Sequence, residues 1–326
     1  MQTTDCTIGI DLGGTKTRLG VVDFLGNVLE QITIPTNVDD GYDAIFADLI
    51  TVIKKFRNTP NSNIKALGVA VAGQVEAVSG LIKFAPNLYW HDVPFGQMLH
   101  DATQLPVVIA NDVRSATYGE LCFGAGKGLE DIICLFIGTG IGGGIVSKGS
   151  LLTGHNNSAG EVGHMVLSIG GLPCTCGNRG CWETLAGGWA ISKNTQTAVR
   201  KDPQAAKQII LNCGGKIDQI TPHHLFDAVK DGDLYATSLM KPIEESLIAG
   251  STTLINAFNP ESLILGGGII EGAPWLVSTI EQGVRLQALK SATEKLSVVR
   301  AQHLKNAAVI GIAAMAMNKI RLTVWQ

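Results

Sequence analysis

The sequence has little charge and no concentration of one sign. Its 326 residues include 25 lysines and arginines against 28 aspartates and glutamates, so the formal net charge is −3 and only 16% of the residues are charged. No run of five or more basic residues occurs. Proteins that bind nucleic acids carry a basic patch or stripe, so we expect no nucleic-acid partner.

Long apolar segments are also missing. Apolar runs such as residues 309–317 are far shorter than the roughly 20 residues that span a bilayer, so we expect no membrane association. The first eleven residues contain neither the basic stretch nor the apolar stretch of a secretory signal. These absences lead us to expect a cytoplasmic protein.

The cysteines do not form the even, dispersed set that a disulfide framework needs. There are seven, and Cys174, Cys176 and Cys181 fall within eight positions. With His164, ten positions before the first of them, they form a Cys₃His set that suits a tetrahedral, structural zinc ion. The alternatives are a Cys-x-Cys redox pair, which leaves the histidine unexplained, and a nucleic-acid zinc ribbon, which needs basic surroundings that only Arg179 supplies.

Short apolar runs that end in glycines alternate with segments of helical periodicity. The first kind predicts buried strands, and residues 42–56, 112–124 and 234–258 are typical of amphipathic helices. Residues 8–34 hold three strands with no room for a crossover helix, which predicts an antiparallel meander. The pattern as a whole indicates a mixed α/β fold.

Two segments of the first half recur in the second half. Residues 14–22 match residues 138–146 with identical internal spacing, and residues 67–75 resemble residues 263–270. Because both pairs of similar segments occur in the same order, we expect two duplicated α/β domains with a ligand cleft between them.

We expect the domain boundary near residue 118, after a strand. Residues 1–117 would form a small N-terminal domain, completed by a C-terminal helix at about 306–320. Residues 118–305 would form a larger domain that contains the zinc-binding loop at 164–183.

Residues 11–16, DLGGTK, follow a strand directly. The two glycines let backbone amides approach a polyphosphate, Thr15 offers a hydroxyl, and Asp11 can hold a magnesium ion through water. The simpler reading is a tight hairpin that needs positive φ, because the turn matches neither GxGxxG nor GxxxxGK[ST]. The similar turn at 138–144 favours a nucleotide whose phosphates are held by both turns. Residues 265–269 would then supply a third glycine-rich surface, for adenosine.

Asp112 stands where a strand meets a predicted helix. One role for an aspartate there is helix capping. The other is to act as a general base that takes a proton from an alcohol as the alcohol attacks a phosphoryl group. Asn111 can provide the cap while Asp112 points into the cleft.

Several further polar residues suit a polyhydroxylated ligand. Glu161 and His164 lie three positions apart after small residues, Asn87 follows a proline, and Glu183 follows the cysteine cluster. Carboxylates and carboxamides pair with adjacent hydroxyls in fixed geometry. Each alone is more often a surface or capping group, and it is the grouping that favours a sugar site.

These motifs together resemble the ROK sugar kinases, a family with the fold of actin, Hsp70 and hexokinase, which is ribonuclease H-like. The motifs that carry the resemblance are DLGGTK (11–16), NDVRSATYGE (111–120), GTGIGGGIV (138–146), AGEVGH (159–164) and CTCGNRGCWE (174–183). They occur in family order and span most of the chain. The resemblance also implies domain closure over the sugar and a homodimer or homotetramer.

The resemblance implies a role for each of these residues. Asp112 would be the catalytic base for the 6-hydroxyl of a hexose, with ATP and magnesium as the phosphoryl donor. The sugar would be bound by Gly73, Asn87, Asn111, Asp112, Glu161, His164 and Glu183. The ATP would be bound by Asp11, Gly13, Gly14, Thr15, Gly138, Thr139, Gly267 and Gly268, with Asp11 near the magnesium.

The resemblance leaves several functions open. The preferred one is phosphorylation of glucose to glucose 6-phosphate, but kinases for N-acetylmannosamine, allose and fructose share much of the residue set. The family also includes sugar-responsive repressors, which carry a helix-turn-helix before the first strand. Here that strand begins near Thr7, so we expect no such domain. A sugar sensor without turnover is the remaining alternative.

The sequence departs from the family pattern at residues 72–76 and at Asn157. Many members have Pro-Gly-Pro-Val-Asp where residues 72–76 read AGQVE, so we expect the loop beside the sugar to differ in shape. Asn157 stands where glycine is frequent, which is tolerable because asparagine readily adopts the left-handed conformation.

Overall fold

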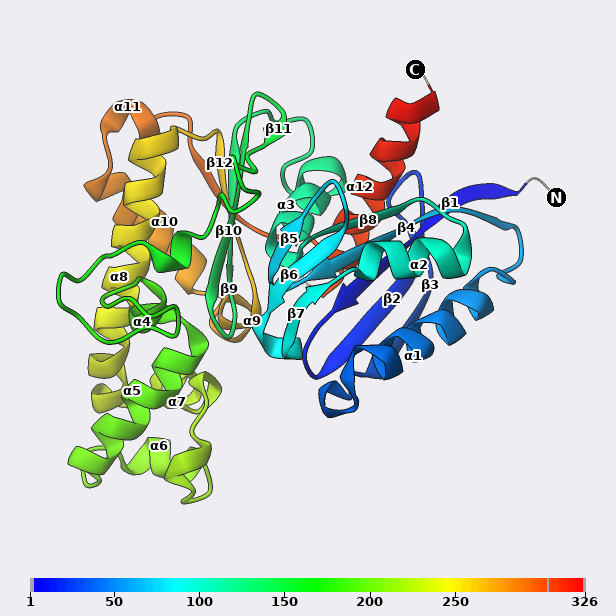
Figure 1. Cartoon of the computed structure of the whole chain (residues 1–326). Helices are drawn as coiled ribbons and strands as arrows, with labels where there is room; N and C mark the ends of the chain where they lie inside the picture. The colour runs from blue at the N-terminus through cyan, green and yellow to red at the C-terminus, as the bar shows by residue number, and fades with distance from the viewer. Residues whose placement is uncertain (1–2, 304, 325–326) are drawn as a thin grey trace. The chain divides into compact units, whose positions relative to one another are not determined.

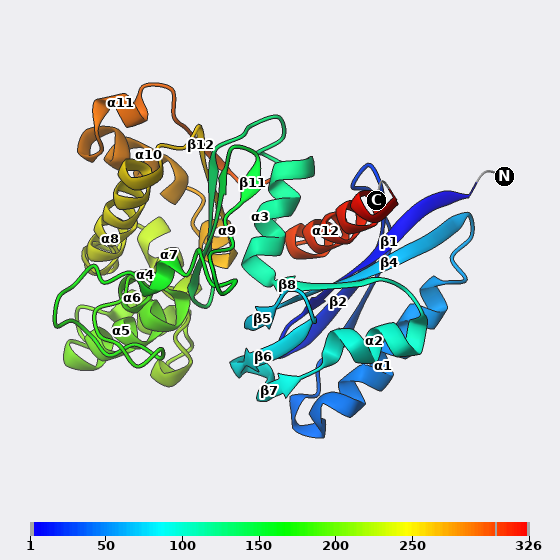
Figure 2. The ribbon, with the colours of Figure 1, turned by 45° about the horizontal axis from the view of Figure 1, so that its top comes forward.

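The structure is a computed structural model that describes residues 3–303 and 305–324. Figures 1 and 2 show the order of the helices and strands. The chain divides into two compact units, each of them discontinuous in sequence. The first unit comprises Met1–Leu129, Gly144–Gly160 and Gln302–Gln326, and the second comprises Glu130–Gly143 and Glu161–Ala301.

This division differs from the predicted boundary after residue 117. Helix α3 (Asp112–Phe123) runs through that position, and the interior of a helix does not separate two units. Residues 144–160 join the first unit because Gly144 packs directly on α3, where a Cβ would collide with the Thr117 hydroxyl. Helix α12 (Ala307–Val324) also belongs to the first unit.

A five-stranded sheet with the order β3-β2-β1-β4-β8 forms the centre of the first unit. Its strands are β1 (Thr4–Leu12), β2 (Lys16–Asp23), β3 (Val28–Pro35), β4 (Ser62–Val71) and β8 (Val107–Asn111). The first three pair antiparallel, which confirms the meander predicted at 8–34. Strand β4 then pairs parallel with both β1 and β8, so the sheet is mixed.

Helices cover both faces of this sheet (Figure 2). One face packs against α1 (Gly41–Phe56), whose Ile45, Leu49 and Phe56 are buried in the core with the strands, and α2 (Phe95–Thr103) lies on the same side. The other face packs against α12, so closely that a Cβ on Gly68 would collide with the Ile312 carbonyl. The C-terminal helix is therefore an integral part of the first unit.

A small three-stranded sheet, in the order β5-β6-β7, belongs to the same unit. Its strands are β5 (Gln74–Glu76), β6 (Leu81–Ala85) and β7 (Trp90–Val93), and the unit also contains the 3₁₀ helices η1 (Val38–Asp40) and η2 (Pro86–Leu88). The sheet directly follows the carboxyl end of β4. It therefore places the segment after β4 and the residues of η2 near each other.

The second large sheet has the order β11-β10-β9-β12-β13. Its strands are β9 (Ile132–Ile137), β10 (Ile141–Ser147), β11 (Ser150–Leu151), β12 (Ser262–Gly266) and β13 (Ser297–Arg300). The segments that resemble each other in sequence occupy equivalent places in the two sheets. Strands β2 and β10 are second in their sheets, and strands β4 and β12 are fourth. Strand β12, like β4, pairs parallel with both neighbours. The two sheets confirm the duplication predicted from the sequence.

Most of the second unit is helical. Its helices are η3 (Val162–His164), α4 (Glu183–Ala186), α5 (Gly188–Lys201), α6 (Lys207–Asn212), η4 (Ile217–Gln219), α7 (Pro222–Lys230), α8 (Leu234–Phe258), α9 (Gly268–Gly272), α10 (Leu276–Gln287) and α11 (Lys290–Thr293). The long helix α8 coincides with the predicted one. Asp233 caps it by accepting a hydrogen bond from the Ala236 amide at 2.6 Å, and it ends at Asn259, which has φ +47°.

Within residues 3–303 and 305–324, no helix combines the length and the apolar character needed to cross a bilayer.

Candidate active site

The turn between β1 and β2 carries the first predicted phosphate-binding residues, Gly13, Gly14 and Thr15. The Thr15 carbonyl accepts a hydrogen bond from the Thr36 amide at 2.9 Å, which anchors the turn. A Cβ on Gly14 would collide with the backbone oxygen of Asn87, so the turn lies directly against η2. The fold thus brings a predicted phosphate-binding turn and a predicted sugar-binding residue into contact within the first unit.

Asp11 is the penultimate residue of β1, the strand that leads into this turn. Its Oδ2 lies 3.2 Å from the Arg18 guanidinium, its partner across the β1–β2 pair. Burial raises the pKa of the Asp11 carboxyl, and the positive charge of Arg18 partly opposes that shift. A half-buried carboxylate beside a glycine turn has the chemistry to hold a hydrated magnesium ion.

Asn111 and Asp112 mark the junction of β8 and α3. The Asn111 side chain accepts a hydrogen bond from the Arg114 backbone amide at 3.1 Å, so Asn111 is the N-cap, as predicted. Asp112 is the first residue of the helix and is half-buried. Its carboxylate is therefore not required for the cap.

Gly73 lies between β4 and β5. A Cβ at this position would collide with the Phe84 carbonyl, so the segment passes close to β6 and tolerates no side chain here. Gly73 follows the carboxyl end of β4, and Asp112 follows the carboxyl end of β8, the strand paired parallel with it. Both predicted residues thus emerge from the same edge of the sheet.

One pair of contacts in the first unit was missed by sequence reasoning. Asn157 has φ +56°, the left-handed conformation considered for it, and its side chain bonds to two other segments. The Arg114 guanidinium donates to its Oδ1 at 2.7 Å, and its Nδ2 donates to the Val75 carbonyl at 2.8 Å. Asn157 therefore connects α3 to β5.

The second glycine turn, with Gly138 and Thr139, lies at the start of helix α5 in the second unit. The carbonyls of these two residues accept hydrogen bonds from the amides of Gly188 and Trp189 at 2.9 and 3.0 Å. Backbone hydrogen bonds to the start of α5 therefore hold this turn in place.

Glu183 supports the same turn. Its Oε2 accepts from the Ile141 amide at 2.9 Å, and its Oε1 accepts from Trp189 Nε1 at 3.0 Å. A Cβ on Gly140 would collide with Oε2, so a larger residue there would displace the Glu183 carboxylate. Each carboxylate oxygen keeps a second lone pair, which leaves Glu183 able to accept from a ligand hydroxyl as well.

Gly267 and Gly268 lie between β12 and α9. Gly267 has φ +92°, and a Cβ there would collide with the Ile137 carbonyl at the end of β9. Because Ile137 immediately precedes Gly138, the second unit brings the two predicted ATP-binding glycine segments side by side.

Glu161 is the N-cap of the short helix η3, and His164 is the last residue of that helix. Glu161 is exposed, and its carbonyl accepts a hydrogen bond from the His164 amide at 3.1 Å. This 3₁₀ turn fixes the spacing of the two side chains. His164 leads directly into the cysteine cluster.

The ligand atoms of His164, Cys174, Cys176 and Cys181 all lie within 4.8 Å of one another. His164 Nδ1 is 3.6 Å from Cys174 Sγ, and Cys176 Sγ is 3.7 Å from Cys181 Sγ. Zinc–sulfur bonds of about 2.3 Å and zinc–nitrogen bonds of about 2.0 Å at tetrahedral angles require S–N and S–S separations of about 3.5 and 3.8 Å. These two separations match the edges of a tetrahedral zinc site.

The turns around the cluster follow from two glycines. Gly177 has φ +90° and Gly180 has φ +74°, as the sequence indicated for the tight turns that gather the sulfur atoms. A Cβ on Gly180 would also collide with the Ser168 carbonyl. Neither position tolerates a larger residue without strain.

The thiols of the cluster differ in their electrostatics. The backbone amide of Asn178 lowers the pKa of Cys176, whereas burial and the neighbouring thiols raise the pKa of Cys181 to about 12. Three adjacent thiolates repel one another, and a divalent cation between them removes that penalty. The electrostatics thus agree with the geometry in favouring a metal site.

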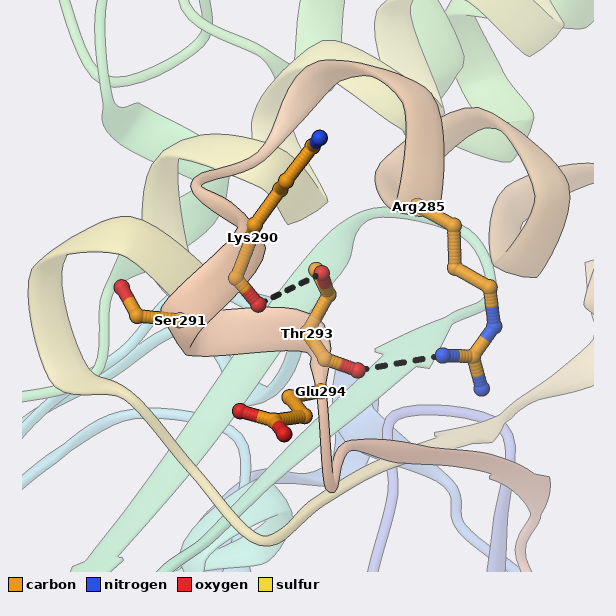
Figure 3. Close-up of a pocket in the computed structure, with 5 residues that line it drawn as sticks. All are labelled: Arg285, Lys290, Ser291, Thr293 and Glu294. Atoms are coloured by element: carbon orange, nitrogen blue, oxygen red, sulfur yellow. Dashed lines mark hydrogen bonds between the residues drawn. The ribbon is translucent and has the colours of Figure 1, made fainter.

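A surface pocket of about 600 Å³ contains none of these residues. Arg285, Lys290, Ser291, Thr293 and Glu294 line it (Figure 3). The Arg285 guanidinium donates to the Thr293 carbonyl at 3.1 Å and to Glu281 at 2.8 Å. These contacts hold and neutralise the Arg285 guanidinium.

Known proteins are similar to this chain over nearly its whole length. The model of the ROK family matches residues 7–319. A glucokinase from Thermotoga maritima is 31% identical over 314 residues, which cover 96% of this chain and 98% of that protein. A xylose repressor from Caldicellulosiruptor bescii is 28% identical over 95% of this chain and 78% of its own length.

A solved structure shares the fold as well. The ROK family glucokinase from Streptomyces griseus, in complex with glucose and AMPPNP, superposes with a TM-score of 0.82 at 31% identity. The match covers 96% of this chain and 99% of that one. The actin- and hexokinase-like fold expected from the sequence is therefore confirmed.

Proposed function

The chain belongs to the ROK family, and on that premise we propose that it is a sugar kinase that transfers the γ-phosphoryl group of ATP to the 6-hydroxyl of glucose. The observation that carries the proposal is the junction of β8 and α3. Asn111 caps the helix, so the carboxylate of Asp112 at the first helical position is not needed for the cap. Near-full-length similarity to glucokinases supports glucose as the acceptor.

In this proposal Asp112 takes the proton of the 6-hydroxyl. The hydroxyl oxygen forms a bond to the γ-phosphorus while the bond from that phosphorus to the bridging oxygen of ADP breaks. In a loose transition state the proton leaves late, so a carboxylate of ordinary basicity suffices if it is well placed. The rigid cap on α3 provides that placement.

The remaining sugar hydroxyls would be bound by carboxylates and carboxamides that the fold already holds in place. Glu183 accepts hydrogen bonds from Ile141 and Trp189, and the backbone of Asn87 lies against Gly14. The other proposed contacts come from Gly73, Asn111, Glu161 and His164. Groups that are rigid before binding lose little entropy when the sugar arrives.

ATP would be bound at the glycine turns. We assign the phosphates to Gly13, Gly14 and Thr15 and to Gly138 and Thr139, and the adenosine to Gly267 and Gly268. Asp11 is the carboxylate suited to hold the magnesium ion, which neutralises charge on the transferred phosphoryl group.

We further propose that the Cys₃His cluster holds a structural zinc ion, whose four protein ligands leave no position for substrate. Zinc would order the loop that connects His164 to Glu183. With Nδ1 directed at the cluster, His164 retains Nε2 as an oriented donor for the sugar. We also propose a cytoplasmic enzyme that forms a homodimer or homotetramer.

The proposal is tested by measuring ADP release with magnesium ATP and a panel of glucose, mannose, fructose, allose, N-acetylglucosamine and N-acetylmannosamine. Glucose should give the highest kcat/KM. A higher kcat/KM for another sugar would assign the enzyme to that sugar. Binding of a sugar without ADP release would instead favour the sensor function, which similarity to the xylose repressor keeps as the second candidate.

A further inference from the structure

We propose that Arg114 and Asn157 are positioning residues for the phosphoryl transfer. Their hydrogen bonds hold the segment at residues 72–76, which includes β5, against the start of helix α3, and so fix this segment beside the sugar relative to Asp112. This inference rests on the proposed function, because it concerns the same sugar site. All of these residues belong to the first unit.

The first argument is the burial of Arg114. Its side chain lies on the first turn of α3, two positions after Asp112, and only 4% of the residue surface is exposed. A guanidinium removed from water is costly unless acceptors compensate for the lost hydration. The Asn157 Oδ1 atom, 2.7 Å away, is such an acceptor.

The second argument is the chemistry of Asn157. A carboxamide offers one acceptor and two donors, and here Oδ1 faces the guanidinium while Nδ2 faces the Val75 carbonyl at 2.8 Å. The reversed amide would place donor against donor and acceptor against acceptor. A carboxylate would satisfy Arg114 and repel the carbonyl, so asparagine is the short side chain that suits both partners.

The third argument is the place of the connected segments. Val75 is the central residue of β5, two positions after Gly73, and Gly73 is pressed against the Phe84 carbonyl. At the start of α3, the backbone amide of Arg114 donates the capping hydrogen bond to the Asn111 side chain. The bridge therefore joins the segment proposed to back the sugar to the turn that carries the proposed base.

The backbone at Asn157 provides a clean variant. With φ +56°, the position accommodates glycine without strain, so Asn157→Gly removes both hydrogen bonds and leaves the backbone conformation favourable. Asn157→Asp keeps the acceptor for Arg114 and places an oxygen against the Val75 carbonyl. Asn156→Gly and Asn156→Asp are matched controls, because Asn156 is the exposed preceding residue.

The test is steady-state kinetics with glucose and ATP on these variants, with thermal unfolding to check the folded fraction. Asn157→Gly should lower kcat/KM for glucose by about 10- to 100-fold, with a raised KM for glucose and an unchanged KM for ATP. Asn157→Asp should lie between Asn157→Gly and the wild type. A merely structural role would lower the active fraction without changing either KM.

A double-mutant cycle tests the bridge as a unit. Arg114→Met retains the bulk of the side chain and removes its donors, and Arg114→Lys, which keeps one charged donor, should recover part of the activity. Arg114→Met combined with Asn157→Gly should lose no more than the worse single variant. Multiplicative losses, or Asn157→Gly kinetics within twofold of wild type, would overturn the bridge alone. A wild type without turnover would overturn the proposed function and this inference together.

Discussion

The side chain of Asn111 accepts a hydrogen bond from the backbone amide of Arg114 at 3.1 Å, which closes the first turn of α3. Asparagine at an N-cap satisfies a backbone donor that would otherwise be left without a partner. The neighbouring Asp112 is therefore not needed as the helix cap. A junction of strand and helix, and not a flexible loop, carries the proposed catalytic carboxylate.

Asp112→Asn should lower kcat for glucose phosphorylation by about 10² to 10⁴, because a general base typically contributes that much to the rate. The KM for glucose should change little, since the amide still bonds to a hydroxyl. Steady-state ADP release measures both parameters. Asp48→Asn on the exposed face of α1 is the control, and a near-normal kcat for Asp112→Asn would remove the residue from its role.

Trp189→Phe should destabilise the protein by about 1 to 3 kcal/mol, because it removes the indole donor to the Glu183 carboxylate. Urea unfolding measures the free energy change. Glu183→Gln should destabilise the Trp189→Phe variant by less than it destabilises the wild type, since the two residues share one hydrogen bond. Fully additive effects would show that the hydrogen bond does not hold Glu183 in solution.

Cys176→Ser should lose the metal and destabilise the loop between His164 and Glu183. Metal content by elemental analysis and thermal unfolding are the measurements. Cys213→Ser, a cysteine outside the cluster, is the control and should retain one zinc ion per chain. A fully active, metal-free Cys176→Ser protein would contradict the scaffold role.

The stability of Asp11→Asn relative to the wild type should increase as the pH rises above about 4, which is the ordinary pKa of an aspartate. Burial raises the pKa of Asp11 in the folded protein, so its contribution to stability is present at low pH and is lost as the pH rises through the raised value. Urea unfolding at pH 4 and pH 7 tests this trend. A stability difference that does not vary with pH would contradict it.

Glu120→Gln should destabilise the first unit by about 2 to 3 kcal/mol. The buried Glu120 carboxylate accepts from the amides of Ala125, Gln302 and His303 at 2.8, 3.0 and 2.7 Å, and the amide nitrogen of glutamine would face those donors. Chemical denaturation provides the measurement. Exposed Glu294→Gln is the control, and equal stability of the two variants would argue against this anchor.

The features that the sequence predicted share a local physical cause. The length and periodicity of α8 are properties of one continuous segment of sequence. The meander follows from connections that are too short for a crossover helix. The Cys₃His set was visible because its ligands lie within one short stretch. Even Asn157 was identified as a position where the left-handed conformation matters.

The missed features depend on contacts between distant segments. Arg114 and Asn157 are 43 positions apart, and nothing in either local pattern shows that they meet. The predicted boundary near 118 failed because α3 continues through it and packs against Gly144. Gly140 was the one available signal for the contact with Glu183, since a glycine run can mark the close approach of another group.

Identification of the phosphorylated product tests the central claim most directly. We would incubate the wild-type protein with magnesium ATP and glucose and determine by ³¹P nuclear magnetic resonance which carbon bears the new phosphate ester, with 6-deoxyglucose as the matched acceptor. Stoichiometric glucose 6-phosphate, and no product from 6-deoxyglucose, is the result predicted here. Phosphate on another carbon, or no ester from folded, glucose-binding protein, would contradict the account.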